Sequence, residues 1–212
     1  MNEPVGILLT AQPNSLPNYS LWNLTLMFFI FSVAGWIWEV IYTAITEKVV
    51  AKRGMLRGPW LPLYGVGGIL ILLLLTRFQS NPLLVFVLAM ILCGTVEYLT
   101  ALAIEKFYGC RWWDYSTKRV HLKGRICLGG VLLFGLSGTA AVCGFGPVLN
   151  DNITRISFPV HAGIVTVLSI LFIVDVVISI MSPNTGRGIT YEINPPETEK
   201  LESGKDHEKT KE

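Results

Sequence analysis

Five long apolar runs, separated by short polar segments, dominate the pattern of this 212-residue chain. The shortest run has 17 residues, which at about 1.5 Å per residue spans roughly 25 Å and suits the apolar layer of a bilayer. Lipid offers no hydrogen-bond partner to bare backbone groups, so each run must be helical. The pattern predicts an all-α, polytopic integral membrane protein, multi-pass in the cell membrane, with five transmembrane helices at 21–45, 60–76, 82–104, 126–149 and 158–181.

The Lys and Arg residues between the runs indicate how the helices are oriented. Fifteen of the 17 lie in the first loop, the third loop and the segment after the last run. Positive charge favours the cytoplasmic side, so we expect the N-terminus outside and the C-terminus inside. The chain then divides into an extracytoplasmic N-terminal tail (1–20), a five-helix transmembrane domain (21–182) and a cytoplasmic tail (183–212). The polar, Glu- and Lys-rich composition of that last segment predicts disorder.

Composition excludes several classes of partner and cofactor. Hydrophobic residues make up 51% of the chain and charged residues only 15%, and the net charge of +2 argues against nucleic acid as a partner. The four cysteines form no CxxC pair and the three histidines are scattered, so we expect neither a metal site nor a cofactor, and no disulfide framework. The lipid bilayer is the first expected partner.

Three acidic residues interrupt the apolar runs and are expensive there unless each has a partner or a wet cavity. Glu39, Glu97 and Asp175 each lie eight residues, or about 12 Å of helix, before a residue that marks the cytoplasmic boundary. These boundary residues are Glu47, Glu105 and Pro183. They should therefore occupy one layer in the cytoplasmic half of the membrane. Three interpretations stay open: a structural lock of ion pairs, a site for an ion, proton or polar substrate, or acids that are protonated or reach the interface. The candidate polar layer also includes Arg53, Arg57, Glu105, Arg125 and, as a further ion-pair partner, Arg111.

Residues 53–65, RGMLRGPWLPLYG, form a Gly- and Pro-rich segment that we call the elbow. We expect it on the cytoplasmic side, with its arginines facing the acidic layer. Pro59 or Pro62 suits the first turn of the second helix, and the fourth helix is expected to begin at Gly124–Arg125. Both helix N-termini would bring partial positive charge to the acids. The elbow's motif residues are Gly54, Gly58, Pro59, Pro62, Tyr64 and Gly65.

The third loop contains a run of aromatic and charged residues that favours the membrane interface. Adjacent tryptophans beside charges suit the headgroup region, so interfacial anchoring is one interpretation. The other is a folded cytoplasmic cap that carries a site. The residues of this interfacial cap are Arg111, Trp112, Trp113, Asp114 and Tyr115.

Known enzyme signatures are absent from the sequence. It has no GxxxxGK[ST], GxSxG or HExxH motif, so no catalytic residue can be named. This favours a protein that is not an enzyme, while leaving an unusual intramembrane enzyme open. Without a P-loop, the sequence encodes no ATP-driven engine of its own.

Several motifs in fixed order resemble the ABC-transporter type IV membrane proteins, the CmpB-like family of bacteria. They lie between residues 23 and 149 and are GWIWE (35–39), RGMLRGP (53–59), EY (97–98), RWWDYS (111–116) and GRIC (124–127). The resemblance implies a bacterial inner-membrane protein that is the permease-like subunit of a transport assembly.

Two kinds of partner and one alternative function follow from that expectation. Five helices are few for a complete permease, so a separate nucleotide-binding subunit or a homo-oligomer is expected. The alternative is a membrane-embedded enzyme or lipid-binding protein with an Arg/acid site at the cytoplasmic face. That site would combine the intramembrane acids with Arg53, Arg57, Arg111 and Asp114, and its arginines, with two helix N-termini, would hold a phosphate headgroup.

Overall fold

The computed structural model describes residues 19–46, 54–182 and 191–192, and all five apolar runs are helical in it. Within these described residues, four helices are long and apolar enough to cross a membrane: Leu21–Thr46, Pro82–Tyr108, Leu128–Thr154 and Phe158–Met181. The second run forms a shorter apolar helix, Pro62–Phe78, so the fifth crossing stays a prediction. The elements are α1 (Leu21–Thr46), α2 (Pro62–Leu75), the 3₁₀ turn η1 (Thr76–Phe78), α3 (Pro82–Tyr108), β1 (Cys110–Arg111), β2 (His121–Leu122), β3 (Ile126–Cys127), α4 (Leu128–Ala140), η2 (Ala141–Phe145), α5 (Gly146–Thr154), α6 (Phe158–Met181) and β4 (Tyr191–Glu192).

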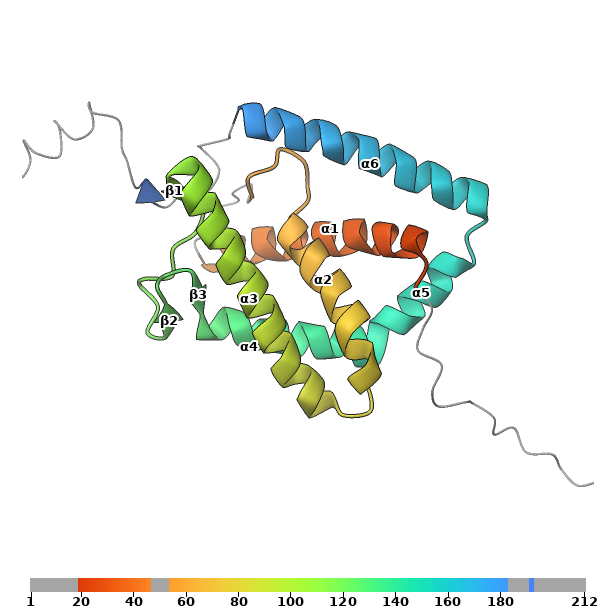
Figure 1. Ribbon diagram of the computed structural model, residues 1–212, viewed down its shortest axis with the longest axis horizontal. Coiled ribbons are helices and arrows are strands. Elements are labelled where there is room, and N and C mark those ends of the chain that lie inside the picture. The colour runs from red at the N-terminus through yellow and green to blue at the C-terminus, as the bar shows by residue number, and fades with distance from the viewer. Residues whose placement is uncertain (1–18, 47–53, 183–190, 193–212) are drawn as a thin grey trace, which may run out of the picture.

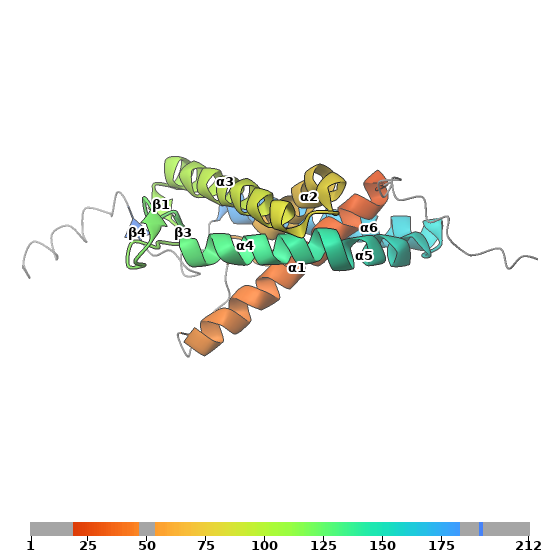
Figure 2. The same ribbon diagram turned by 90° about the horizontal axis from the view of Figure 1, so that it is seen from below.

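In the view of Figure 1, α6, α1 and α4 lie across the picture from top to bottom, and α2 and α3 run obliquely to them. Figure 2 shows that α1 is inclined to α4 and projects from one face of the bundle. The most extensive contacts join α3 to α4 and α1 to α2. The short strands gather at one end of the bundle, beside the C-terminal end of α3 and the start of α4 (Figure 1).

The outer faces of the helices are apolar, as expected for a bundle surrounded by lipid. Along α6, the side chains of Ile170, Ile173, Val174 and Val177 are each at least half exposed. A soluble protein rarely exposes so large a contiguous apolar surface. Together with the four candidate spans, this distribution identifies a multi-pass membrane protein.

The third loop differs from the prediction of an all-α chain. Strands β2 and β3 pair antiparallel around a tight turn, in which Lys123 and Gly124 have positive φ values of 51° and 70°. The fourth helix therefore begins at Leu128, and the prediction that it begins at Gly124–Arg125 is wrong. Glycine suits position 124 of this turn because it adopts the left-handed conformation without steric cost.

Two residues of the C-terminal segment also have defined structure. Tyr191 and Glu192 form β4, which pairs antiparallel with β1. The rest of that segment, and the N-terminal tail, lie outside the described residues.

The fourth run bends where η2, a π-helical turn, joins α4 to α5. Pro147, in the first turn of α5, lacks an N–H, and a π turn is one way in which a helix accommodates such a break. Gly146 lies at the bend, where a Cβ would be 2.3 Å from the carbonyl oxygen of Ala141.

Candidate functional site

Asp175 on α6 accepts four hydrogen bonds, three of which come from the elbow and hold it in place. Its Oδ1 accepts from the Arg57 backbone N–H at 3.0 Å and from the Ser179 hydroxyl at 3.3 Å. Its Oδ2 accepts from the Gly58 backbone N–H at 2.8 Å and from the Trp60 indole N–H at 2.7 Å. Successive backbone N–H groups that converge on one carboxylate form a compact anion-binding nest. Asp175 is therefore held by the backbone of a loop, since α2 begins only at Pro62.

Trp60 orients this loop because its ring is packed among aromatic side chains. It lies edge-on to Phe172 of α6 and beside Phe29 of α1, with ring centroids 6.0 and 6.2 Å apart. Leu56, 3% exposed, belongs to the same buried cluster. Two apolar anchors on the loop thus fix the backbone N–H groups that Asp175 binds.

Glu39 on α1 accepts a hydrogen bond of 2.5 Å from the Tyr64 hydroxyl of α2. The two helices can approach this closely because Gly35 lies one turn before Glu39. A Cβ on Gly35 would be 2.2 Å from Cγ of Tyr64, so the small residue is needed there. The small residues on α1 thus bring a tyrosine to the intramembrane acid.

Glu97 on α3 is 4% exposed and accepts a 3.3 Å hydrogen bond from the Tyr115 hydroxyl of the third loop. Its other oxygen, Oε2, is buried and has no hydrogen-bond partner within the described ranges. Glu39 and Tyr64 both lie near enough to Glu97 to interact with it electrostatically. We call Glu39, Tyr64, Glu97 and Tyr115 the acid–tyrosine cluster.

Tyr115 joins this cluster from outside the spanning segments. Burial, and after it the negative charge of Glu97, raise the pKa of the Tyr115 hydroxyl above its usual range. The hydroxyl therefore stays protonated at neutral pH and remains a hydrogen-bond donor to Glu97.

The cap is folded around a separate group of ion pairs. Glu105 binds Arg125 through contacts of 2.7 and 2.9 Å and Arg111 at 3.2 Å. Asp114 lies 3.7 Å from Arg111, and hydrogen bonds from Ser116 hold the pKa of Asp114 below its usual range. Glu105 of α3 therefore binds both guanidinium groups, and Asp114 of the cap adds a second carboxylate beside Arg111.

The two tryptophans of the cap pack inward. Trp112 is buried, with its ring edge-on to Tyr108, and Trp113 donates its indole N–H to the Arg125 carbonyl at 2.9 Å. These contacts agree with a folded cap, one of the two interpretations of the motif. They also connect the end of α3 to the start of α4.

The structure brings the predicted residues together only in part. Glu39 and Glu97 share one cluster, but the hydrogen bonds described for them come from tyrosines, whereas the sequence suggested arginines. Arg53 lies outside the described residues, and the Arg57 side chain donates to Ser182 at 3.2 Å. Sequence reasoning missed the Trp60 donor, although a Trp between two prolines beside an acidic layer was a usable signal.

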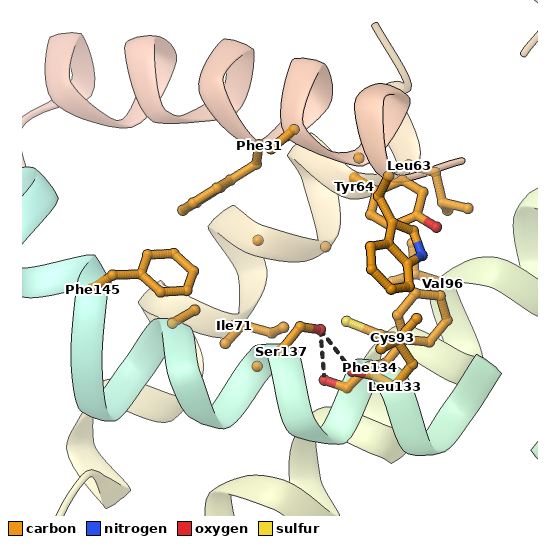
Figure 3. Close-up of a pocket in the computed structure, with 17 residues that line it drawn as sticks. Phe31, Leu63, Tyr64, Ile71, Cys93, Val96, Leu133, Phe134, Ser137 and Phe145 are labelled. Carbon is orange, nitrogen blue, oxygen red and sulfur yellow. Dashed lines mark hydrogen bonds between the residues drawn. The ribbon is translucent and has the colours of Figure 1, made fainter. Parts of the chain in front are cut away.

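A groove of about 330 Å³ lies beside the cluster, between α1, α2, α3, α4 and η2. Figure 3 shows Tyr64, Leu63 and Val96 at one end, and Phe31 and Phe145 toward the other. The lining is almost wholly apolar, and the hydroxyl of Ser137 is turned to carbonyls of its own helix at 2.8 and 3.4 Å. Tyr64 belongs both to the lining of the groove and to the acid–tyrosine cluster. The apolar groove therefore has the polar cluster at one of its ends.

These features define a multi-pass membrane protein with buried carboxylates beside an apolar groove. The model of a family described as "Putative ABC-transporter type IV" matches residues 26–180, and the chain belongs to that family. The match confirms the resemblance of the motifs and extends it through α6. No curated protein and no solved structure matches the chain. The chain is thus a multi-pass membrane protein of a transport-related family.

Proposed function

We propose that the chain is the membrane-spanning, permease-like subunit of a transport assembly in the bacterial inner membrane. Five helices cross the bilayer, with the N-terminus outside and the cap in the cytoplasm. The observation that carries the proposal is the acid–tyrosine cluster at the end of an apolar groove. A purely structural layer would place a cation on each acid, whereas Glu97 has a buried oxygen without a hydrogen-bond partner among the described residues. Ionisable residues of this kind mark substrate and ion paths in membrane proteins.

The energy for transport comes from a separate nucleotide-binding subunit, because the sequence has no P-loop motif. The turn between β1 and β3 offers that subunit an exposed surface. Val120 and Leu122 are both more than half exposed there, and the exposed residues Lys118, Arg119 and Lys123 flank them in the sequence. Apolar side chains rimmed by basic ones suit an acidic partner surface with an apolar centre.

Affinity purification of the full chain from its native membranes tests the proposal. We expect an ATPase subunit to co-purify, and its ATP hydrolysis to depend on the membrane chain. Leu122→Glu in the cap should release that subunit by introducing a like charge at the contact. Ser80→Glu, at an exposed position between α2 and α3 at the other end of the bundle, is the matched control and should retain it. A complex that never contains an ATPase, in a strain whose transport is unchanged by deletion of the chain, contradicts the proposal.

A second candidate function is the binding of a membrane amphiphile without transport, and the groove favours it. The version in which Arg111 helps to hold a phosphate headgroup has less support, because Glu105 already binds its guanidinium group. A phosphate would have to displace this carboxylate. The headgroup of a bound amphiphile would therefore contact the acidic residues near the groove rather than the arginine of the cap.

A further inference from the structure

We infer that the groove binds the apolar chain of a bilayer amphiphile whose cationic head lies against Glu97 and Glu39. The inference deepens the proposed function by naming its substrate class, and only the transport role of this ligand rests on that proposal. Binding itself needs no ATPase. It can therefore be tested on the isolated chain, whatever partner the chain has.

The groove is accessible to lipid. Trp38 and Phe145 line it and are 44% and 48% exposed, and Ser137 is exposed as well. All three lie in segments long and apolar enough to cross a membrane, so what surrounds them is the apolar layer of the bilayer. An amphiphile can reach the groove sideways without passing through water.

The size of the groove suits a single chain. A water molecule takes up about 30 Å³ of liquid, so about 330 Å³ has room for on the order of ten heavy atoms. The aromatic rings of Phe31 and Phe134 and the side chain of Ile71 provide the apolar contacts. One alkyl chain of about a dozen carbons fills such a space, and its affinity comes from burying apolar area.

The head of the amphiphile is placed by the polar end of the groove. Tyr64 lines the groove and binds Glu39. Glu97 lies one turn after Cys93 and next to Val96, which line the groove from α3, but Glu97 itself is not a lining residue. The head of the ligand donates to Glu97 Oε2, which is buried and has no partner in the described part of the chain. Leaving such an acceptor unpaired is costly, so a donor from the ligand is strongly favoured.

The charge of the head follows from its neighbours. Two carboxylates lie within electrostatic range of each other, and the hydrogen bonds described for them come from neutral hydroxyls. A protonated amine both donates a hydrogen bond and compensates negative charge, whereas a phosphate is repelled. The simplest ligand with this chemistry is a long-chain alkylamine.

Three probes with the same tail separate the contributions of tail and head: dodecylamine, dodecanol and dodecyl phosphate. Each is radiolabelled and equilibrated with the full chain in nanodiscs of zwitterionic lipid, and binding to empty nanodiscs is subtracted. We expect the amine to bind more tightly than the alcohol, and the phosphate most weakly. Equal or tighter binding of dodecyl phosphate overturns the assignment of a cationic head.

Two substitutions on α4 test the groove. Ser137→Leu fills it and should abolish binding of amine and alcohol alike. Ala140→Leu is the matched control, because Ala140 is exposed on the same helix but does not line the groove, and it should bind both probes as the wild type does. Equal binding by the two variants overturns the inference. A second combination of results also overturns the inference: the wild type binds no probe and forms a dimer, and Ser137→Leu disrupts that dimer. In that case a second copy of the chain occupies the groove.

Glu97→Gln tests the head. It should weaken dodecylamine binding by about 10- to 150-fold, the range expected for loss of a charge-assisted hydrogen bond, and leave dodecanol binding unchanged. An unchanged ratio of amine to alcohol affinity overturns the role of Glu97. If this variant does not elute as folded protein in gel filtration, Glu39→Gln provides the same comparison. If the probes fail these tests but an ATPase subunit still co-purifies with the chain, only the assignment of the ligand is refuted. If the probes bind as expected but no ATPase subunit co-purifies, only the transport proposal is refuted.

Discussion

The link between Asp175 and the elbow predicts a large and specific loss of stability in Asp175→Asn. The least costly orientation of the new amide puts its nitrogen at the Oδ1 position, where the Ser179 hydroxyl can accept from it. The Arg57 N–H then faces another donor, which costs about 1–3 kcal/mol for a buried group. The hydrogen bonds from Gly58 and Trp60 then end on a neutral instead of a charged acceptor, which lowers the stability of the fold by about 1 kcal/mol for each bond.

Removing the charge also relieves the cost of burying it, so we expect a net loss of about 2–4 kcal/mol. That is a substantial part of the 5–15 kcal/mol that stabilises a typical folded protein, and corresponds to a fall in Tm of roughly 5–15 °C. Asp151→Asn makes the same chemical change at an exposed aspartate of α5 and should shift Tm by little.

Thermal unfolding in detergent, followed with a thiol-reactive dye, measures the effect directly. Cys93 and Cys110 are free and buried, so they react only as the bundle opens. The exposed Cys143 is replaced by serine in every variant to lower the background. If Asp175→Asn melts within about 2 °C of Asp151→Asn, the carboxylate does not hold the elbow and the reasoning is refuted.

Three further predictions concern packing, the cap and topology. Gly65→Ala should cost about 1–3 kcal/mol in the same unfolding assay, because its Cβ would lie 2.3 Å from a serine oxygen of α1, whereas Gly163→Ala has open space and should be neutral or stabilising. The lowered pKa of Asp114 means that its carboxylate contributes stability above about pH 4, which is lost as pH falls through that pKa. Asp114→Asn should therefore melt below the wild type at pH 7 and converge with it near pH 2. In a cysteine-free background on intact cells, an impermeant maleimide should label Asp151→Cys and spare Lys118→Cys.

Each of these has a contradicting result. Equal melting of the two glycine variants would show that α1 and α2 are not tightly packed at Gly65. A constant difference between Asp114→Asn and the wild type across the pH range would show that the charge of this residue is not involved. The reverse labelling pattern would overturn the proposed orientation of the chain.

The helical parts of the fold were predictable because the bilayer simplifies the problem. Apolar runs must be helical in lipid, and the five predicted runs agree with the described helices to within a few residues at most boundaries. The exception is the fourth run, where a turn between short strands replaces the expected start of the helix. Strand pairs of two residues leave almost no periodic signal, and β4 pairs with a segment about eighty residues earlier in the chain.

The candidate site was predictable in its residues but not in its contacts. Helical spacing identified the intramembrane acids and the small residues beside them, and Gly35 indeed allows Tyr64 to reach Glu39. It could not show that tyrosines would bind Glu39 and Glu97. A helical period says which side chains share a face, whereas the partner of that face depends on how the helices are rotated and crossed.

By itself, the sequence determined that this is a helical membrane protein, which segments are helices, which family it belongs to and which acids lie inside the apolar runs. Those properties follow from local composition and order, and no distant contact changes them. Only the tertiary structure decided that the backbone of the elbow binds Asp175 and that Glu105 binds Arg111 and Arg125. It also decided that Tyr64 lies at one end of an apolar groove. These depend on atoms from helices far apart in the chain meeting within about 3 Å, a condition that packing sets and residue order alone does not.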